Sequence, residues 1–387
     1  MNYFFTEEQR ELQKLARKVA EEKVKPVAAY YDQHEEFPWE LVKLFAELDF
    51  FRLCIEEEYG GMGGGVTELA IITEELSRAC GGISLSVAAS ALGMFPIIIS
   101  GTPEQKQKYL PDLADGKHLA GFCLTEPEAG SDAGAIKTRA VLDGDHYILN
   151  GKKHFITNGS VAKVYTVIAS TDPSKGSRGA TAFIVEEGFQ GLSYGKKEDK
   201  MGIRASATSE VIFEDCRVPV ANRIGAEGQG FIVAMKTLDK SRPGVAAQAL
   251  GIAQGAYDLA VEYSRQREQF GQSIVSFQAI QFMLADMAIQ IEAARSLIYA
   301  TARMIDSGEK NIAKESAMCK VMASDVAMKV ATDAVQIFGG YGYMKDYPIE
   351  KFMRDAKITQ IYEGTNQIQR LVIARNIIRE GASVAKK

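Results

Sequence analysis

Cysteine and histidine are scarce in this chain, and their spacing excludes two kinds of site. The 387 residues include five cysteines, which lie far apart and form no CxxC pair. Such spacing is typical of reduced, mostly buried thiols in a cytoplasmic protein. The four histidines show no metal-ligand spacing, so we predict that no metal is bound.

Three further features are missing, and each missing feature excludes a class of protein. No uninterrupted apolar run approaches the length that spans a membrane, so we expect no membrane association. The N-terminus, MNYFFTEEQRELQ, is acidic and polar within a few residues, unlike a signal or transit peptide, which favours a cytoplasmic location. The net charge of -5, without a basic stripe interleaved with aromatics, argues against binding of nucleic acid.

The residues that are present indicate a globular protein, since 46% of them are hydrophobic and the chain is long enough for two or three domains. Residues 1–118 have helical periodicity, with Thr6 as a predicted N-cap. The glycine-rich stretch 59–65 predicts a loop; it lacks the GxGxxG spacing of a dinucleotide-binding loop. Residues 84–100 predict an apolar helix rich in small residues, which either pack against other helices or leave room for a ligand.

The period changes after residue 118. Short stretches rich in β-branched and aromatic residues alternate with turn signals such as Asp143-Gly144 and Asn158-Gly159. This spacing predicts a small antiparallel β domain over residues 119–229. The predicted strands cover residues 119–124, 147–149, 164–169, 181–185 and 210–213.

The helical pattern returns over residues 230–387. Three long amphipathic segments, 231–265, 277–305 and 314–338, are joined by short links, which favours antiparallel packing in a bundle. Their apolar surface exceeds what one face needs, so either subunits meet there or a central helix is well buried. The order of helices, strands and helices predicts an α+β fold and argues against a Rossmann fold.

The stretch QIYEGTNQIQRLVIAR at 360–375 places a carboxylate directly before a predicted helix. Gly364 allows a sharp turn after Glu363. If Asn366 is the N-cap, Gln369 stands at the capping-box position. This geometry suits an acid that points into a cavity, although an incidental acid on a surface turn has the same pattern.

Three other segments carry polar groups that a protein core does not need. FCLTEPEAGSD at 122–132 offers hydroxyls and amides that can hold the polar edge of a ring or a phosphate. REQFG at 267–271 offers an arginine and a glycine turn that can grip a pyrophosphate. QIFGGYG at 336–342 ends a helix with glycines that permit close backbone contact, as many helix ends do.

In this order, and together with KHFITNG at 153–159 and YEGTNQIQR at 362–370, these motifs resemble the acyl-CoA dehydrogenase family across nearly the whole chain. The resemblance implies an N-terminal α-helical domain (1–118), a middle antiparallel β domain (119–229) and a C-terminal four-helix bundle (230–387). It also implies FAD as the cofactor and a homotetramer, a dimer of dimers.

The resemblance implies that Glu363 is the catalytic base. In relatives without an acid there, the base comes from the helix that contains LDKSRPG; in this chain that position is Ser241, so no second base competes. The residues that match the family's FAD contacts are Phe122, Leu124, Thr125, Gly130, Ser131, Phe155, Thr157, Arg267, Phe270, Gln278, Gln336, Gly340, Thr365 and Gln367. Those that match its substrate contacts are Ser131, Asp239, Arg242, Tyr362, Gly364 and Arg375.

The implied reaction is α,β-desaturation of an acyl-CoA thioester, with a proton taken from Cα and a hydride from Cβ. Several segments are similar to short-chain, butyryl-CoA-type members, and the small residues at 88–93 also suit a branched or cyclic acyl group. Ile83 stands where glutaryl-CoA-type relatives have an arginine, which disfavours a dicarboxylate. The family further implies electron-transfer flavoprotein as the electron acceptor.

Two other functions remain open at this point. An acyl-CoA oxidase, or another flavin enzyme of the same fold, passes electrons to oxygen, and the sequence does not discriminate it from a dehydrogenase. A non-enzymatic relative that binds DNA or acts as a scaffold needs a basic face and no acid. The net charge of -5 and the YEGT turn argue against that second alternative.

Overall fold

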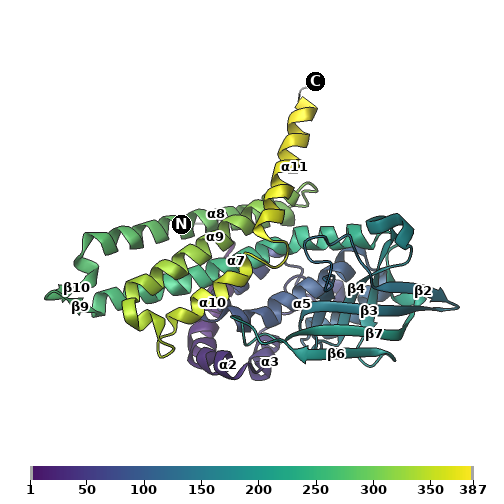
Figure 1. Cartoon of the computed structure of the whole chain (residues 1–387), viewed down its shortest axis with the longest axis horizontal. Coiled ribbons are helices and arrows are strands. Elements are labelled where there is room, and N and C mark those ends of the chain that lie inside the picture. The colour runs from purple at the N-terminus through teal and green to yellow at the C-terminus, as the bar shows by residue number, and fades with distance from the viewer. Residues whose placement is uncertain (1–2, 385–387) are drawn as a thin grey trace.

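A computed structural model describes residues 3–384 and has three parts in chain order: helices, a sheet and helices. The sheet occupies one end of the molecule and the long C-terminal helices extend to the other, as Figure 1 shows. The predicted α+β order is therefore confirmed. One core cluster joins the N-terminal helices to the sheet, and a second fills the C-terminal bundle.

The N-terminal part is helical, as expected. The N-cap at Thr6 is confirmed: its hydroxyl accepts a hydrogen bond from the Gln9 backbone N–H at 3.2 Å, and the Gln9 side chain accepts one in return from the Thr6 N–H at 3.0 Å. The α-helices are α1 (Glu7–Val19), α2 (Ala28–His34), α3 (Trp39–Glu47), α4 (Val66–Ala79), α5 (Gly81–Ser100) and α6 (Pro103–Ala114).

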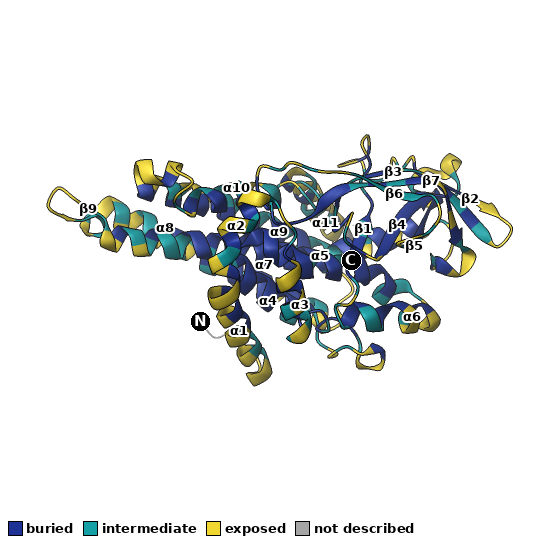
Figure 2. Cartoon of the chain, turned by 90° about the horizontal axis from the view of Figure 1, so that it is seen from below, coloured by how far each residue is buried: buried dark blue, intermediate teal, exposed yellow. Residues whose placement is uncertain are grey.

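Helix α5 corrects one expectation from the sequence. With 20 residues it is long and apolar enough, by length and composition, to cross a membrane. However, 78% of its most apolar window is buried inside the protein, so α5 is a core helix. Figure 2 shows α5 among the dark, buried elements at the centre of the molecule.

The middle part is a single eight-stranded sheet in the order β6-β7-β3-β2-β4-β5-β8, with β1 paired to β4. Most pairs are antiparallel, but both β1 and β2 run parallel to β4. The expected strands are present; β2, β6 and β8 were missed because two are largely exposed and the third has two residues. The strands are β1 (Ala120–Cys123), β2 (Arg139–Asp143), β3 (His146–Thr157), β4 (Val164–Ser170), β5 (Ala180–Glu186), β6 (Leu192–Lys197), β7 (Thr208–Pro219) and β8 (Arg223–Ile224).

The C-terminal part is a bundle built around one long helix. Figure 2 shows this helix, α7, deep in the molecule with α8 and α10 towards its surface. Its interior is rich in buried alanine, which lets neighbouring helices approach closely. The elements are α7 (Gly230–Gln266), β9 (Glu268–Gln269), β10 (Gln272–Ser273), α8 (Gln278–Asp306), α9 (Ala313–Phe338), α10 (Ile349–Thr359) and α11 (Asn366–Val384).

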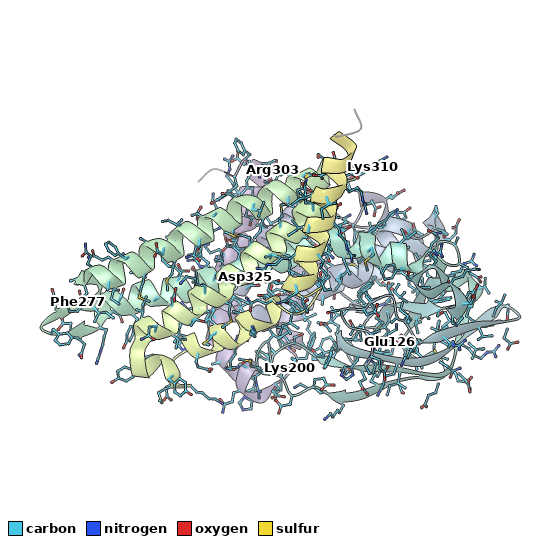
Figure 3. All side chains as sticks on the ribbon, turned by 45° about the horizontal axis from the view of Figure 1, so that its top comes forward. Glu126, Lys200, Phe277, Arg303, Lys310 and Asp325 are labelled. Carbon is cyan, nitrogen blue, oxygen red and sulfur yellow. The ribbon has the colours of Figure 1, made fainter. Side chains whose placement is uncertain are left out.

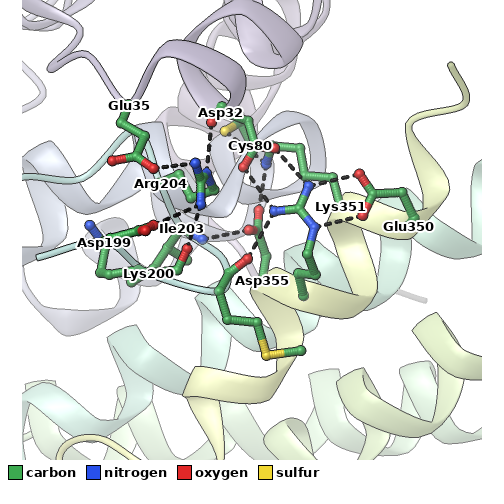
Figure 4. Close-up of polar contacts among 12 residues, drawn as sticks. Asp32, Glu35, Cys80, Asp199, Lys200, Ile203, Arg204, Glu350, Lys351 and Asp355 are labelled. Carbon is green, nitrogen blue, oxygen red and sulfur yellow. Dashed lines mark hydrogen bonds and ion pairs between the residues drawn. The ribbon is translucent and has the colours of Figure 1, made fainter. Parts of the chain in front are cut away.

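A polar junction ties the three parts together (Figure 4). On α10, the Asp355 carboxylate accepts the Ile203 backbone N–H of the β part at 2.6 Å and the Lys351 ammonium at 2.5 Å. Arg354 of the same helix reaches the Asp32 carboxylate of α2 at 2.7 Å. Arg204 donates to the Asp32 backbone carbonyl at 3.0 Å. The loop before β7 is therefore anchored to both helical parts.

Candidate active site

A cleft of about 780 Å³ lies where the three parts meet, and we call it the central cleft. One wall comes from the loop after β1 and from β3, the other from α7 and the turn before α11. Helix α5 adds small and apolar side chains. The lining includes Leu85, Ala88, Ala89, Leu92, Phe122, Leu124, Thr125, Gly130, Ser131, Phe155, Thr157, Ser241, Arg242, Gly244, Gln248, Tyr362, Glu363, Gly364 and Arg375.

Glu363 reaches the cleft from a tight turn with unusual backbone geometry. Its φ is +51°, in the left-handed region that favours glycine, and Gly364 follows at +91°. A Cβ atom on Gly364 would lie 2.4 Å from Gln369 Nε2. That amide nitrogen donates to the carbonyl oxygens of Glu363 at 2.9 Å and of Gly364 at 3.1 Å. The turn is thus both strained and held, a combination common at functional sites.

The structure decides which of two adjacent residues caps α11. Thr365, not Asn366, caps the helix, because its hydroxyl accepts the Ile368 backbone N–H at 3.3 Å. Asn366 is buried and its amide donates to the Ser324 hydroxyl at 2.9 Å and to the Asp325 carboxylate at 2.8 Å. Gln369 holds the turn instead of completing a capping box with Asn366. The sequence left this choice open because either residue type caps a helix well.

The environment of Glu363 suits a proton acceptor. The Ser241 hydroxyl of α7 donates to its carboxylate at 2.6 Å. Burial raises the pKa of Glu363 above its ordinary value, while the Ser241 hydrogen bond and the charges of Arg242 and Lys320 oppose that rise. A carboxyl group whose pKa is raised towards neutrality, and which still faces a cleft, is matched to general-base chemistry.

The other wall includes the ring of Phe155. Phe155 on β3 has φ of +56° and is 61% exposed, an unusual exposure for so large an apolar ring, and it lines the cleft. Thr125, Ser131 and Thr157, which carry hydroxyls, line the cleft as well. Nothing lies within 4 Å of where a Cβ would stand on Gly130, so the backbone there is open to a ligand.

A buried ion pair supports this wall from behind. Lys153 donates to the Glu126 carboxylate at 2.7 Å and to the Leu124 carbonyl at 3.1 Å. Glu126, labelled in Figure 3, also accepts the backbone N–H groups of Lys137 and Thr138. Burial favours the neutral acid, but Lys153 outweighs it and keeps the pKa of Glu126 below its ordinary value. The loop after β1 is therefore fixed to β3.

One end of the cleft is closed by a chain of hydrogen bonds. The Tyr362 hydroxyl donates to the Gln248 side-chain oxygen, and the Gln248 amide donates to the Gly81 carbonyl at 2.9 Å. Gln248 is almost fully buried on α7, and both side chains line the cleft. These polar groups limit the depth of the cleft on the side of α5.

Three family models match successive parts of the chain. They describe the acyl-CoA dehydrogenase N-terminal domain at residues 6–117, the middle domain at 121–216 and the C-terminal domain at 228–378. The chain belongs to the acyl-CoA dehydrogenase family. Acyl-CoA dehydrogenases are FAD-dependent oxidoreductases that act on acyl-CoA thioesters.

Similar proteins include short-chain acyl-CoA dehydrogenases. A short-chain specific acyl-CoA dehydrogenase of Clostridium acetobutylicum is 51% identical over 98% of this chain and 100% of its own length. Butyryl-CoA dehydrogenase from Megasphaera elsdenii is 48% identical, with a TM-score of 0.94 over 97% of this chain and 99% of that one. A chain from a structure described as electron transferring flavoprotein of Acidaminococcus fermentans is 53% identical, with a TM-score of 0.95 over the same shares.

The predicted site residues fall into two groups in the acyl-CoA dehydrogenase fold. Most line the central cleft, while Asp239 pairs with Arg242 beside it and Thr365 and Gln367 begin α11. The second group lies at the far end of the bundle, near β9 and β10 (Figure 1). Along α7, Ser241 and Arg267 are separated by about 40 Å at the ordinary helical rise. The second group comprises Arg267, Phe270, Gln278, Gln336 and Gly340.

Sequence reasoning missed the residues that hold the site from within helices. Gln248 lies in an alanine-rich segment of α7, and Lys320 lies in an apolar segment of α9. The only available signal was a lone polar residue at a position where helical periodicity places the core. Gln369 was singled out for its spacing, but its contact to the turn that carries Glu363 was not expected.

Proposed function

We propose that this chain is an FAD-dependent dehydrogenase of short acyl-CoA thioesters, with Glu363 as the base that removes the Cα proton. The observation that carries this proposal is the position of Glu363, which lines the same cleft as Phe155 and lies on a turn that fixes its backbone. The position on α7 that supplies the base in some relatives is Ser241 in this chain, and its hydroxyl donates to Glu363.

The residues of the sheet wall fit a flavin. Phe155 offers an exposed ring, Thr125 and Thr157 offer hydroxyls for the polar edge of a ring system, and the backbone at Gly130 is open. The wall is also preorganised by the Lys153–Glu126 pair behind it. When bound, FAD supplies the acceptor for the hydride that leaves Cβ, chemistry that no side chain can perform.

The chain's own residues carry the proton half of the reaction. Glu363 accepts the Cα proton, and the elevated pKa of its carboxyl makes that transfer less unfavourable. Ser241 orients the carboxylate by donating to one of its oxygens. The Glu363 backbone N–H donates to no acceptor within residues 3–384, so it is free to bind the thioester oxygen as negative charge develops there.

The CoA end of the substrate is assigned to Asp239, Arg242 and Arg375. Arg242 is almost fully buried, and its Nε has no hydrogen-bond partner in the described part of the chain. A buried guanidinium N–H without a partner is costly, and a bound polar ligand would satisfy it. The charge of Arg242 also opposes the rise in the pKa of Glu363. In this proposal, Arg242 therefore both binds CoA and favours the ionised form of the base.

The closed end of the cleft favours a short acyl group. Gln248 and Tyr362 occupy the space that a longer chain needs, while Ala88 and Ala89 leave width for a branched or cyclic group. Ile83 is buried in the core beside α4 and offers no cation to a distal carboxylate. These features support butyryl-CoA and compact relatives over palmitoyl-CoA or glutaryl-CoA.

A second copy of the chain completes the cofactor site in this proposal. The predicted cofactor residues near β9 lie too far from the cleft for one dinucleotide to contact both within one chain. Exposed apolar residues on α8, including Phe282 and Ile289, suit contacts between copies in the homotetramer. Electron-transfer flavoprotein is the proposed electron acceptor, supported by the similar Acidaminococcus fermentans chain. We place the enzyme in the cytoplasm.

Anaerobic titration of the purified protein with butyryl-, isobutyryl-, cyclohexanecarboxyl-, glutaryl- and octanoyl-CoA tests the proposal. We expect butyryl-CoA or a compact relative to bleach the visible flavin band most fully. A bound flavin that no member bleaches would overturn the proposed reaction. Hydrogen peroxide formation in air, at the rate of substrate loss, would instead identify an oxidase.

A further inference from the structure

Lys320 is a fully buried lysine directly behind the turn that carries Glu363. From α9, its ammonium donates to the Gly364 carbonyl at 2.8 Å and to the Asn366 side-chain oxygen at 2.9 Å. Both acceptors are neutral. Within residues 3–384, no carboxylate lies within 4.0 Å of its nitrogen. The ammonium is therefore held by oxygen dipoles and not neutralised by a close partner.

Other buried lysines of the chain are neutralised. Lys153 pairs with Glu126 at 2.7 Å, and Lys351 pairs with Asp355 at 2.5 Å. A buried cation without a counter-ion is costly, and such groups persist where they serve a function. Burial lowers the pKa of Lys320 to about 8, and the carboxylate whose charge raises it most is Glu363. Of the carboxylates around Lys320, Glu363 is therefore the one with which its charge interacts most, although Ser241 and Arg242 act on Glu363 more strongly.

We propose that Lys320 is a positioning residue for the reaction: it holds the Glu363–Gly364 turn through the Gly364 carbonyl, and its charge favours the ionised form of Glu363. The inference rests on the proposed role of Glu363 and goes beyond it. Lys320 does not line the central cleft, so it acts through the turn and not on the substrate.

The other charged groups around Lys320 set the background for its effect. Arg242 on α7 adds a second positive charge that acts on both Lys320 and Glu363. The negative charge of Asp325, further along α9, raises the pKa of Lys320. That carboxylate is already paired with Arg370 at 2.7 Å. Figure 3 labels Asp325 on the helical bundle. Loss of Lys320 therefore leaves Glu363 with Arg242 as its remaining cation.

Lys320→Met removes the charge and nearly preserves the shape. Because a nearby cation favours the carboxylate form, its removal raises the pKa of Glu363. We expect the acid limb of the pH profile of kcat/KM on butyryl-CoA to move up by about one pH unit, with activity recovering at higher pH. Ser324→Ala is the matched control, because Ser324 contacts the same Asn366 from the same helix but carries no charge.

Comparison of Lys320→Met with Ser324→Ala separates the effect of the Lys320 charge from the effect of a changed contact to Asn366. Ser324→Ala is expected to lower the thermal midpoint of the holoenzyme without moving the acid limb. An unmoved limb in Lys320→Met, or equal shifts in both variants, overturns the inference. If Lys320→Met does not fold, Lys320→Gln, which keeps a donor without charge, must show the same upward shift. Failure of wild-type holoenzyme to oxidise butyryl-CoA would instead overturn the proposed function.

Discussion

The two walls of the central cleft each rest on a buried lysine, but the two lysines are compensated differently. Behind the sheet wall, Lys153 meets the Glu126 carboxylate, and the pair forms a closed structural unit. Behind the turn wall, Lys320 meets only neutral oxygens, so its charge extends towards Glu363. The same residue type thus supports shape on one side of the cleft and, in our proposal, the ionised form of the proposed base on the other.

Backbone strain is shared by both walls. Phe155 on the sheet side and Glu363 on the turn side are non-glycine residues with positive φ, at +56° and +51°. Each costs on the order of 1–3 kcal/mol that the surrounding contacts must offset. Strain on the sheet side presents a ring to the cleft, whereas strain on the turn side presents a carboxylate. Four predictions, from the largest effect to the smallest, test this division.

Glu363→Gln should cause the largest loss. It removes the proposed base and leaves the sheet wall intact, so the protein should stay yellow while the rate of flavin bleaching by butyryl-CoA falls by about 10⁴-fold. Stopped-flow absorbance gives the rate, and the flavin-to-protein ratio is the control. Bleaching at the wild-type rate would remove Glu363 from the mechanism.

Lys153→Met should act on stability and not on the base. It leaves Glu126 buried and unpaired, which costs about 3–5 kcal/mol of unfolding free energy. Urea unfolding measures the loss, and the loop after β1 should release flavin more readily. Lys153→Met combined with Glu126→Gln removes the unpaired charge and should recover part of the stability. An unchanged midpoint in the single variant would contradict the role assigned to this pair.

Gly364→Ala should distort the turn wall. The new Cβ meets Gln369 Nε2 at 2.4 Å, and the φ of +91° is unfavourable for alanine. Because a displacement of about 1 Å can cost about 100-fold in rate, we expect a fall of that order in kcat. Gly381→Ala, on α11 with open space around it, is the matched control and should leave kcat unchanged.

Ser241→Ala should have the smallest effect, and it should raise the pKa of Glu363. The Ser241 hydroxyl stabilises the charged form of Glu363, so its loss raises the pKa of that carboxyl. The acid limb of kcat/KM should then move to higher pH by up to about one unit, with the plateau nearly retained. A downward shift would mean that Ser241 stabilises the neutral acid instead.

The sequence singles out residues in recognisable motifs more readily than residues that support those motifs from within helices. Glu363 and Ser131 lie in a turn and a loop, and Phe155 lies on β3, each within a motif that contains glycine and polar residues. Lys320 and Gln248 lie inside helices, where their roles depend on which loop packs against that turn of the helix. The spacing of Gln369 was noticed, but the choice between Thr365 and Asn366 as N-cap was left open, because local pattern cannot decide between two adjacent capping residues.

The outline of the fold was predictable wherever the sequence carries a long periodic pattern. Long amphipathic segments predicted α7, α8 and α9 almost to the residue, since their apolar periodicity spans many turns. Strand β2 has mostly exposed side chains and left no alternating pattern to detect. Helix α5 has no polar face because protein surrounds most of it, so composition alone does not distinguish it from a membrane helix.

The three parts of the chain are joined by the polar junction of Asp32, Arg204, Arg354 and Asp355. One part therefore cannot easily be replaced by the corresponding part of a relative. Asp355 pairs with Lys351 on its own helix and with the Ile203 backbone of the β part. A β domain transplanted from a relative must therefore bring a loop of matching length, and its host must offer the same acid. Recombination between family members would succeed most often where the exchanged segment carries both sides of this contact, so the junction constrains how such enzymes diversify.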